Sequence, residues 1–115
     1  KTGALFNASV ELGLILGCAN NTTRTFLMEY SNCLGLLFQI TDDILDVTGT
    51  IEELGKKPGS DIRQHKSTYV SLLGLEQAKH QAYLVGSQAH DALNLVSYDT
   101  TILSALIDYL LERTN

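Results

Sequence analysis

Hydrophobic residues recur three and four positions apart along most of this chain, a spacing that predicts helices. Five helices are predicted, at residues 2–18, 23–46, 68–73, 75–96 and 100–112. Asn20-Asn21-Thr22 is expected to form the turn and N-cap before the second helix, and Asp99 to cap the last. Because no stretch alternates as a strand would, the pattern predicts an all-α fold in which residues 1–115 form a single segment.

The first predicted helix is apolar around nearly its whole circumference, which is typical of a helix enclosed by others. Its large apolar residues are Leu5, Phe6, Val10, Leu12, Leu14, Ile15 and Leu16. Asn7 and Glu11 interrupt the run, which is short for a membrane span, so we expect a core helix and no stable membrane insertion. Glu11 would need a partner from elsewhere. If the enclosing helices are absent, the exposed apolar surface predicts self-association.

The second predicted helix separates into an apolar side and an acidic side. The apolar side, expected to pack in a core, comprises Phe26, Leu27, Tyr30, Leu34, Leu37, Phe38, Ile44 and Leu45. Asp42, Asp43 and Asp46 project within about 60° of Gln39 on the other side. Asn32 and Gly35 lie on this second side too.

Three carboxylates so close together need a physical reason. Carboxylates at these spacings repel one another, and the end of a helix disfavours negative charge. A cation would relieve both costs, and a site of oxygen donors without His or Cys suits Mg²⁺. We therefore interpret Asp42, Asp43 and Asp46 as candidate metal ligands. The alternative is a solvated acidic helix end.

Residues 47–66 lose the helical spacing and contain three glycines and the only proline. Such a long connection is often a lid or a binding loop. Lys56, Lys57, Arg63 and Lys66 concentrate basic charge there, although a mixed-charge solvent loop is the alternative.

Composition narrows the class of protein. The 115 residues are enough for one modest core, and 44% hydrophobic with 18% charged residues is typical of a globular chain. Eight basic and 13 acidic residues give a net charge of −5, which argues against a nucleic-acid partner. Cys18 and Cys33 lie in apolar helical stretches and are interpreted as reduced core residues of a cytoplasmic protein. His80 and His90 would not share a helix face, which disfavours a metal role.

An ordered set of motifs resembles the trans-isoprenyl diphosphate synthases, most closely the bacterial farnesyl diphosphate synthases. The motifs are Lys1-Thr2-Gly3, Phe38-Gln39-Ile40-Thr41-Asp42-Asp43-Ile44-Leu45-Asp46-Val47, Leu54-Gly55-Lys56, Gly59-Ser60-Asp61 and Lys66-Ser67-Thr68-Tyr69. The resemblance covers essentially the whole chain. It implies the C-terminal part of the isoprenoid synthase helical bundle, and a homodimer when the protein is complete.

The resemblance also implies a reaction. These enzymes ionise an allylic diphosphate (dimethylallyl or geranyl), and isopentenyl diphosphate then attacks the cation and loses a proton. Asp42, Asp43 and Asp46 match the second aspartate-rich motif, which holds Mg²⁺. Diphosphate-binding residues are matched by Lys1, Lys56 and Lys66, and catalytic positions near the cation by Lys1, Thr2 and Gln39.

The chain differs from the members of that family in its length. Those members are more than twice this length and use two aspartate-rich motifs, of which the first is absent here. The sequence does not begin with Met and looks like a portion of a longer protein, so the 115 residues alone are expected to be inactive. Alternatives are a geranylgeranyl or longer-chain synthase, a terpene cyclase and a non-catalytic partner subunit. A content of only 7% aromatic residues argues against the cyclase, and the intact acidic motif against the subunit.

Overall fold

The computed structural model describes residues 2–48 and 69–114. The described residues form helices and no strand, which confirms the all-α prediction. The helices are α1 (Thr2–Leu16), α2 (Asn21–Thr48), α5 (Tyr69–Leu73), α6 (Leu75–Asn94) and α7 (Thr101–Glu112). Each predicted helix is present, and α2 extends two residues beyond the prediction at each end. Nearly all of the predicted loop lies outside the described residues.

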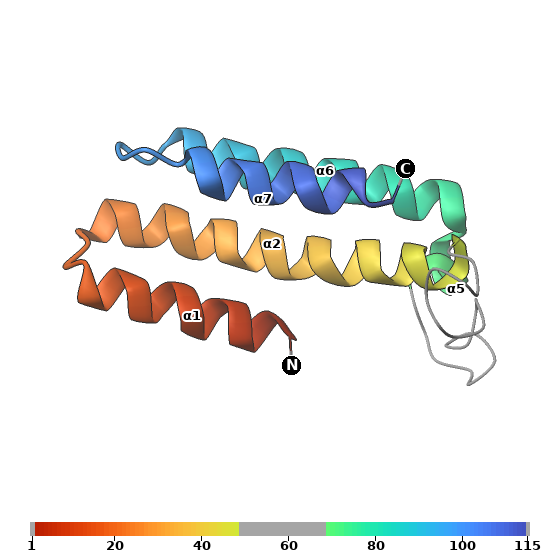
Figure 1. Cartoon of the computed structure of the whole chain (residues 1–115), viewed down its shortest axis with the longest axis horizontal. Helices are drawn as coiled ribbons and strands as arrows, with labels where there is room; N and C mark the ends of the chain where they lie inside the picture. The colour runs from red at the N-terminus through yellow and green to blue at the C-terminus, as the bar shows by residue number, and fades with distance from the viewer. Residues whose placement is uncertain (1, 49–68, 115) are drawn as a thin grey trace.

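The long helix α2 forms the centre of the arrangement (Figure 1). It packs against α1 on one side and against α6 and α7 on the other. The short helix α5 lies at the end of the bundle where α2 finishes and α6 begins. The last turns of α2 therefore extend past the start of α1.

The core lies chiefly between α2 and α6. Helix α2 contributes large side chains, including Leu37, Ile40 and Ile44, which are fully buried. Helix α6 contributes mostly small ones, namely Ala78, Ala82, Val85, Gly86, Ala89, Ala92 and Leu93. Large residues facing small ones let two helix backbones approach closely without leaving voids. The predicted apolar side of α2 is confirmed, since all its members are buried or half-buried.

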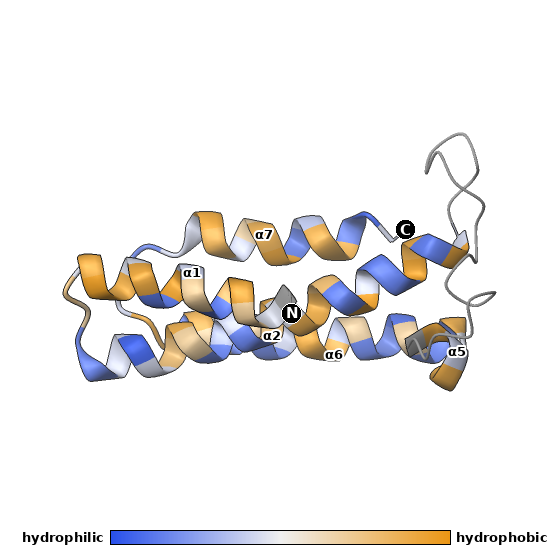
Figure 2. Ribbon diagram, turned by 90° about the horizontal axis from the view of Figure 1, so that it is seen from below, coloured by the Kyte–Doolittle hydropathy of each residue, from blue (hydrophilic) through white to orange (hydrophobic). Residues whose placement is uncertain are grey.

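Among the described residues α1 is not enclosed by other helices, and its apolar surface is exposed, as expected if the enclosing helices are absent. Only Leu14 of its large apolar side chains is buried. Leu5, Leu12, Ile15 and Leu16 are more than half exposed, because α1 packs mainly against α2. Figure 2 shows hydrophobic colour along most of α1. Among the residues that the structure describes, no helix is long and apolar enough to cross a membrane.

One of the two predicted caps is present at its predicted position, whereas Thr100 and not Asp99 occupies the N-cap position of α7. The side chain of Asn20 accepts a hydrogen bond from the backbone N–H of Thr23 at 2.8 Å, as an N-cap residue does. Asp99 accepts from the backbone N–H of Thr101 at 2.9 Å and from its hydroxyl at 2.6 Å. These hydrogen bonds to Thr101 lower the pKa of the Asp99 carboxyl.

Cys18 and Glu11 differ from expectation. Cys18 is exposed in the turn after α1, with a φ of 53°, whereas Cys33 is half-buried in α2. Both thiols are free. Glu11 is half-exposed and lies 3.8 Å from the guanidinium of Arg24. Water therefore solvates much of the Glu11 carboxylate, which would have needed a partner within the protein if it were buried.

Candidate functional site

The acidic stretch occupies the last turns of α2, beside α5 (Figure 1). Gln39 and Asp42 are exposed, and Asp43 is half-buried. Asp46 is buried, with 6% of its surface accessible, so the predicted line of carboxylates is not uniformly open. The helical projection predicts direction around α2, but burial depends on what packs at this end of the bundle.

The start of α1 packs against α2 about two turns before the acidic stretch. A Cβ atom added to Gly35 would lie 3.1 Å from the Cα of Gly3, so the two backbones touch there. Asn7 contacts Asn32, one turn in the other direction along α2, which shows that the helices run antiparallel. The backbone of Thr2 therefore lies just after Gly35 along α2, and Gln39 and the acidic stretch lie further toward the end of that helix.

A small polar network fixes the register of α1 on α2. The amide of Asn7 donates to the side-chain oxygen of Asn32 at 2.8 Å. The hydroxyl of Ser31, which is fully buried, donates to the amide oxygen of Asn7 at 2.7 Å. Sliding either helix by a turn would leave the Ser31 hydroxyl buried without that partner, at a cost of about 1–3 kcal/mol.

The structure does not describe the predicted basic residues of the site. Lys1, Lys56 and Lys66 lie outside the described residues. Thr2 is described as the first residue of α1, without its side chain. The site as described thus consists of the acidic end of α2, with the start of α1 packed about two turns before it.

Arg113, which follows α7, lies against α2 and is not among the site residues that the sequence predicts. Its guanidinium donates to the hydroxyl of Thr41 at 2.9 Å and to the carbonyl of Phe38 at 3.4 Å. The guanidinium carbon also lies 4.9 Å from the centre of the Phe38 ring, and that ring lies 5.8 Å from the ring of Phe6. The only signal in the sequence is an arginine after an amphipathic helix, which ordinarily predicts a surface side chain.

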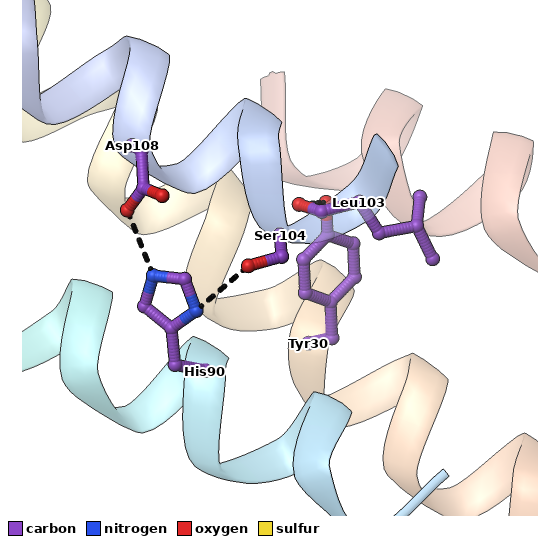
Figure 3. A network of polar contacts seen from close by, with 5 residues as sticks. All are labelled: Tyr30, His90, Leu103, Ser104 and Asp108. Carbon is purple, nitrogen blue, oxygen red and sulfur yellow. Dashed lines mark hydrogen bonds and ion pairs between the residues drawn. The ribbon is translucent and has the colours of Figure 1, made fainter. Parts of the chain in front are cut away.

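A second polar cluster joins α6 to α7 (Figure 3). The imidazole of His90 lies 3.0 Å from the Asp108 carboxylate through Nε2 and 3.2 Å from the Ser104 hydroxyl through Nδ1. The trio contains the residue types of a hydrolytic triad. Such a site also needs a cavity and oxyanion donors beside the nucleophile. The cavity described next has none of the three among its lining residues, so we interpret the cluster as an interhelical contact.

A cavity of about 440 Å³ lies at the opposite end of the bundle from the acidic stretch. It is bounded by α1, the start of α2 and the segment that joins α6 to α7. Its lining is largely apolar and includes Val10, Leu14, Leu27, Val96 and Leu103. The cavity is therefore not part of the acidic site.

The donor chemistry of the acidic stretch fits a hard cation. Asp42, Asp43, Asp46 and the amide of Gln39 supply oxygen donors. Over the ranges described, no three His, Cys, Asp or Glu residues are arranged as a metal-binding group. An ion held here would need further ligands, which is the habit of Mg²⁺ completed by water and phosphate oxygens.

Comparisons with known proteins identify the family. Residues 1–97 match a sequence model of the Polyprenyl synthetase family. The chain is 47% identical to the chloroplastic geranylgeranyl pyrophosphate synthase of Capsicum annuum, covering all of this chain and 31% of that protein. It is 44% identical to the farnesyl diphosphate synthase of Escherichia coli K12, covering 98% of this chain and 39% of that protein.

A third relative is the dimethylallyltranstransferase of Fischerella ambigua, which is 42% identical over all of this chain and 33% of that protein. The chain thus spans about a third of the length of the curated relatives it matches. The match to the family extends over most of the chain, including α1, α2 and the acidic stretch. The chain accordingly belongs to the Polyprenyl synthetase family, a family of prenyltransferases.

Proposed function

We propose that this chain takes part in Mg²⁺-dependent, head-to-tail prenyl transfer. The substrates are dimethylallyl or geranyl diphosphate and isopentenyl diphosphate, and the product is farnesyl diphosphate. The observation that carries the proposal is the close contact of Gly3 with Gly35. It places the start of α1 against α2 about one turn before Gln39. Lys1 lies outside the described residues, and its role at this site is part of the proposal.

The proposed roles follow from the chemistry of the leaving group. The bond between the allylic carbon and the diphosphate oxygen breaks, and the oxygen keeps the electron pair. Lys1, Lys56 and Lys66 bind the departing diphosphate and offset its charge. Asp42, Asp43 and Asp46 hold the Mg²⁺, which when bound neutralises further charge on the same oxygens.

The carbon that remains is positive, and the double bond of isopentenyl diphosphate attacks it. Loss of a proton then restores a double bond in the lengthened chain. Thr2 and Gln39 contribute oxygen dipoles that stabilise positive charge without competing as nucleophiles. Lys1 contributes at the diphosphate side of the same centre.

Geranylgeranyl diphosphate is the second candidate product. The relative at 47% identity is named a geranylgeranyl pyrophosphate synthase, and the one at 44% a farnesyl diphosphate synthase. The two products differ by one condensation and use the same acidic stretch. Product analysis by chain length, starting from geranyl diphosphate, distinguishes fifteen carbons from twenty.

The direct test is stabilisation by Mg²⁺ and pyrophosphate together. We expect the thermal unfolding midpoint of the natural gene product that carries these residues to rise, by the equivalent of about 2.7 kcal/mol at 100 times the dissociation constant. Asp42→Asn should abolish most of this rise. Asp91→Asn, which removes an exposed carboxylate on α6, is the matched control and should retain it.

Two results would contradict the proposal: no rise in the unmodified protein, or an equal rise in Asp42→Asn. Activity provides a second measurement. The natural gene product should condense geranyl diphosphate with isopentenyl diphosphate, whereas the isolated 115 residues should give no product above background.

A further inference from the structure

We infer that Arg113 is a positioning residue for the acidic site, holding the turn of α2 from which Gln39 and Asp42 project. The inference rests on the proposed function, because it concerns the same site. Arg113 itself touches neither of those side chains in any contact described above. It acts through Phe38 and Thr41.

The contacts of Arg113 bracket that turn. Its guanidinium bonds the carbonyl of Phe38 and the hydroxyl of Thr41, which are the residues just before Gln39 and just before Asp42. It also lies over the Phe38 ring. Phe38 and Thr41 face inward, half-buried and fully buried, while Gln39 and Asp42 are exposed. The inner side of the turn is thus held while its outer side meets solvent.

Hydrogen bonding fixes the rotation of the Thr41 side chain as well as its position. Thr41 Oγ1 also bonds the carbonyls of Leu37 at 3.0 Å and Phe38 at 3.2 Å. Arg113 therefore binds a hydroxyl whose orientation the helix already sets. A planar guanidinium that bonds two points and stacks on a ring constrains the helix more than a point charge would.

Net stability is a poor explanation for this arrangement. The Nε of Arg113 is buried and has no hydrogen-bond partner within the described ranges. Burying a donor without a partner costs free energy, which offsets part of what the other contacts contribute. The hydrogen bonds and the ring contact of the guanidinium converge on residues 38 and 41, which is the placement expected of a residue that orients its neighbours.

Four substitutions separate the effect of geometry from the effects of charge and of stability. Arg113→Lys keeps the positive charge and loses the planar fork. Thr41→Val removes the acceptor from the other side of the contact, while Thr41→Ser keeps it. Tyr30→Phe is the matched control, because it also removes a hydrogen bond between α2 and the α7 region but lies two turns of helix away from Phe38.

The assay is condensation of geranyl diphosphate with isopentenyl diphosphate by the natural gene product, with Mg²⁺ varied. Arg113→Lys and Thr41→Val should each lower kcat about 10- to 100-fold, as expected for a small displacement of catalytic groups. The half-saturating Mg²⁺ concentration should rise in both. The double variant should lose no more than the more impaired single variant, because both remove one contact.

Thr41→Ser should recover most of the kcat lost in Thr41→Val, and Tyr30→Phe should lower the unfolding midpoint with less than a twofold change in kcat. The inference is overturned if Arg113→Lys keeps the unmodified kcat and Mg²⁺ dependence, or if Tyr30→Phe loses as much activity at an equal loss of stability. If Arg113→Lys does not fold, the Thr41 pair decides the question.

Failure of this inference is distinguishable from failure of the proposed function. If the unmodified protein neither forms product nor is stabilised by Mg²⁺ and pyrophosphate, both the proposed function and this inference are refuted. If it does both and the Arg113 and Thr41→Val variants behave like Tyr30→Phe, the inference alone is overturned.

Discussion

The backbone of Gly35 in α2 touches that of Gly3 in α1, and a Cβ at residue 35 would lie 3.1 Å from the Cα of Gly3. The relationship is one-sided. A Cβ at residue 3 would meet no atom within 4 Å. The close approach therefore favours glycine at position 35, because a Cβ there would require the two backbones to move apart slightly, whereas a Cβ at position 3 meets no such obstacle.

Gly35→Ala should weaken the contact between α1 and α2, because the obstructing atom belongs to the backbone and cannot rotate away. Gly13→Ala is the matched control, since it also adds a methyl group within a helix but meets nothing within 4 Å. We expect the free energy of unfolding of Gly35→Ala to be about 1–3 kcal/mol below that of Gly13→Ala. Urea denaturation measures the difference, and equal stability of the two variants would contradict the prediction.

Tyr30 links α2 to α7 through a hydrogen bond from its hydroxyl to the carbonyl of Leu103 at 2.9 Å (Figure 3). Burial raises the pKa of Tyr30 from 10.0 to about 12. The neutral phenol is therefore favoured in the folded protein. Its contribution to stability is complete below pH 10 and is lost as the pH rises toward 12.

Tyr30→Phe should lower the free energy of unfolding by about 0.5–1.5 kcal/mol at neutral pH. The difference from the unmodified protein should shrink above pH 10, where ionisation penalises only the protein that retains the phenol. Unfolding curves measured at several pH values test both statements. Tyr83→Phe, which changes an exposed tyrosine on α6, is the control, and identical behaviour of the two variants would refute the prediction.

The cluster of His90, Ser104 and Asp108 should stabilise the packing of α7 on α6 rather than perform chemistry. When its proton is on Nε2, the imidazole donates to Asp108 and accepts from Ser104, so both nitrogens are satisfied. Because the cluster is half-exposed, His90→Ala should cost only about 0.5–1.5 kcal/mol. His80→Ala, at an exposed position of α6, should cost less.

A double-mutant cycle tests the partnership in that cluster. The coupling free energy between His90→Ala and Asp108→Asn should be positive and below about 1 kcal/mol. Strict additivity would show that the 3.0 Å contact does not contribute.

The exposed apolar face of α1 should cause the isolated 115 residues to self-associate. Leu12 and Leu16 are 58% and 76% exposed on the same helix, and monomeric proteins rarely expose large contiguous apolar areas. Replacing both with Gln should shift the sedimentation profile toward monomer. Leu84→Gln, on α6, should leave it unchanged. A single monomeric species for the unmodified chain at all concentrations would rule the prediction out.

Local features of this protein follow from the sequence because neighbours along the chain determine them. The spacing of apolar residues predicts the two sides of α2, and short polar residues predict the N-cap at Asn20 and the carboxylate at the start of α7. Each of these features depends on atoms that lie within one or two turns of the same helix. The same local reasoning selects the acidic stretch as the candidate metal site.

Only the tertiary structure decides which of those residues are held, covered or brought together. Arg113 and Thr41 lie 72 positions apart and His90 and Asp108 lie 18 apart, so no local pattern predicts either contact. The burial of Asp46 and the exposure of Cys18 likewise depend on which elements pack nearby. The direction in which a side chain projects from a helix is fixed by the helical backbone. Its burial and its hydrogen-bond partners depend on which other segments of the folded chain lie against it.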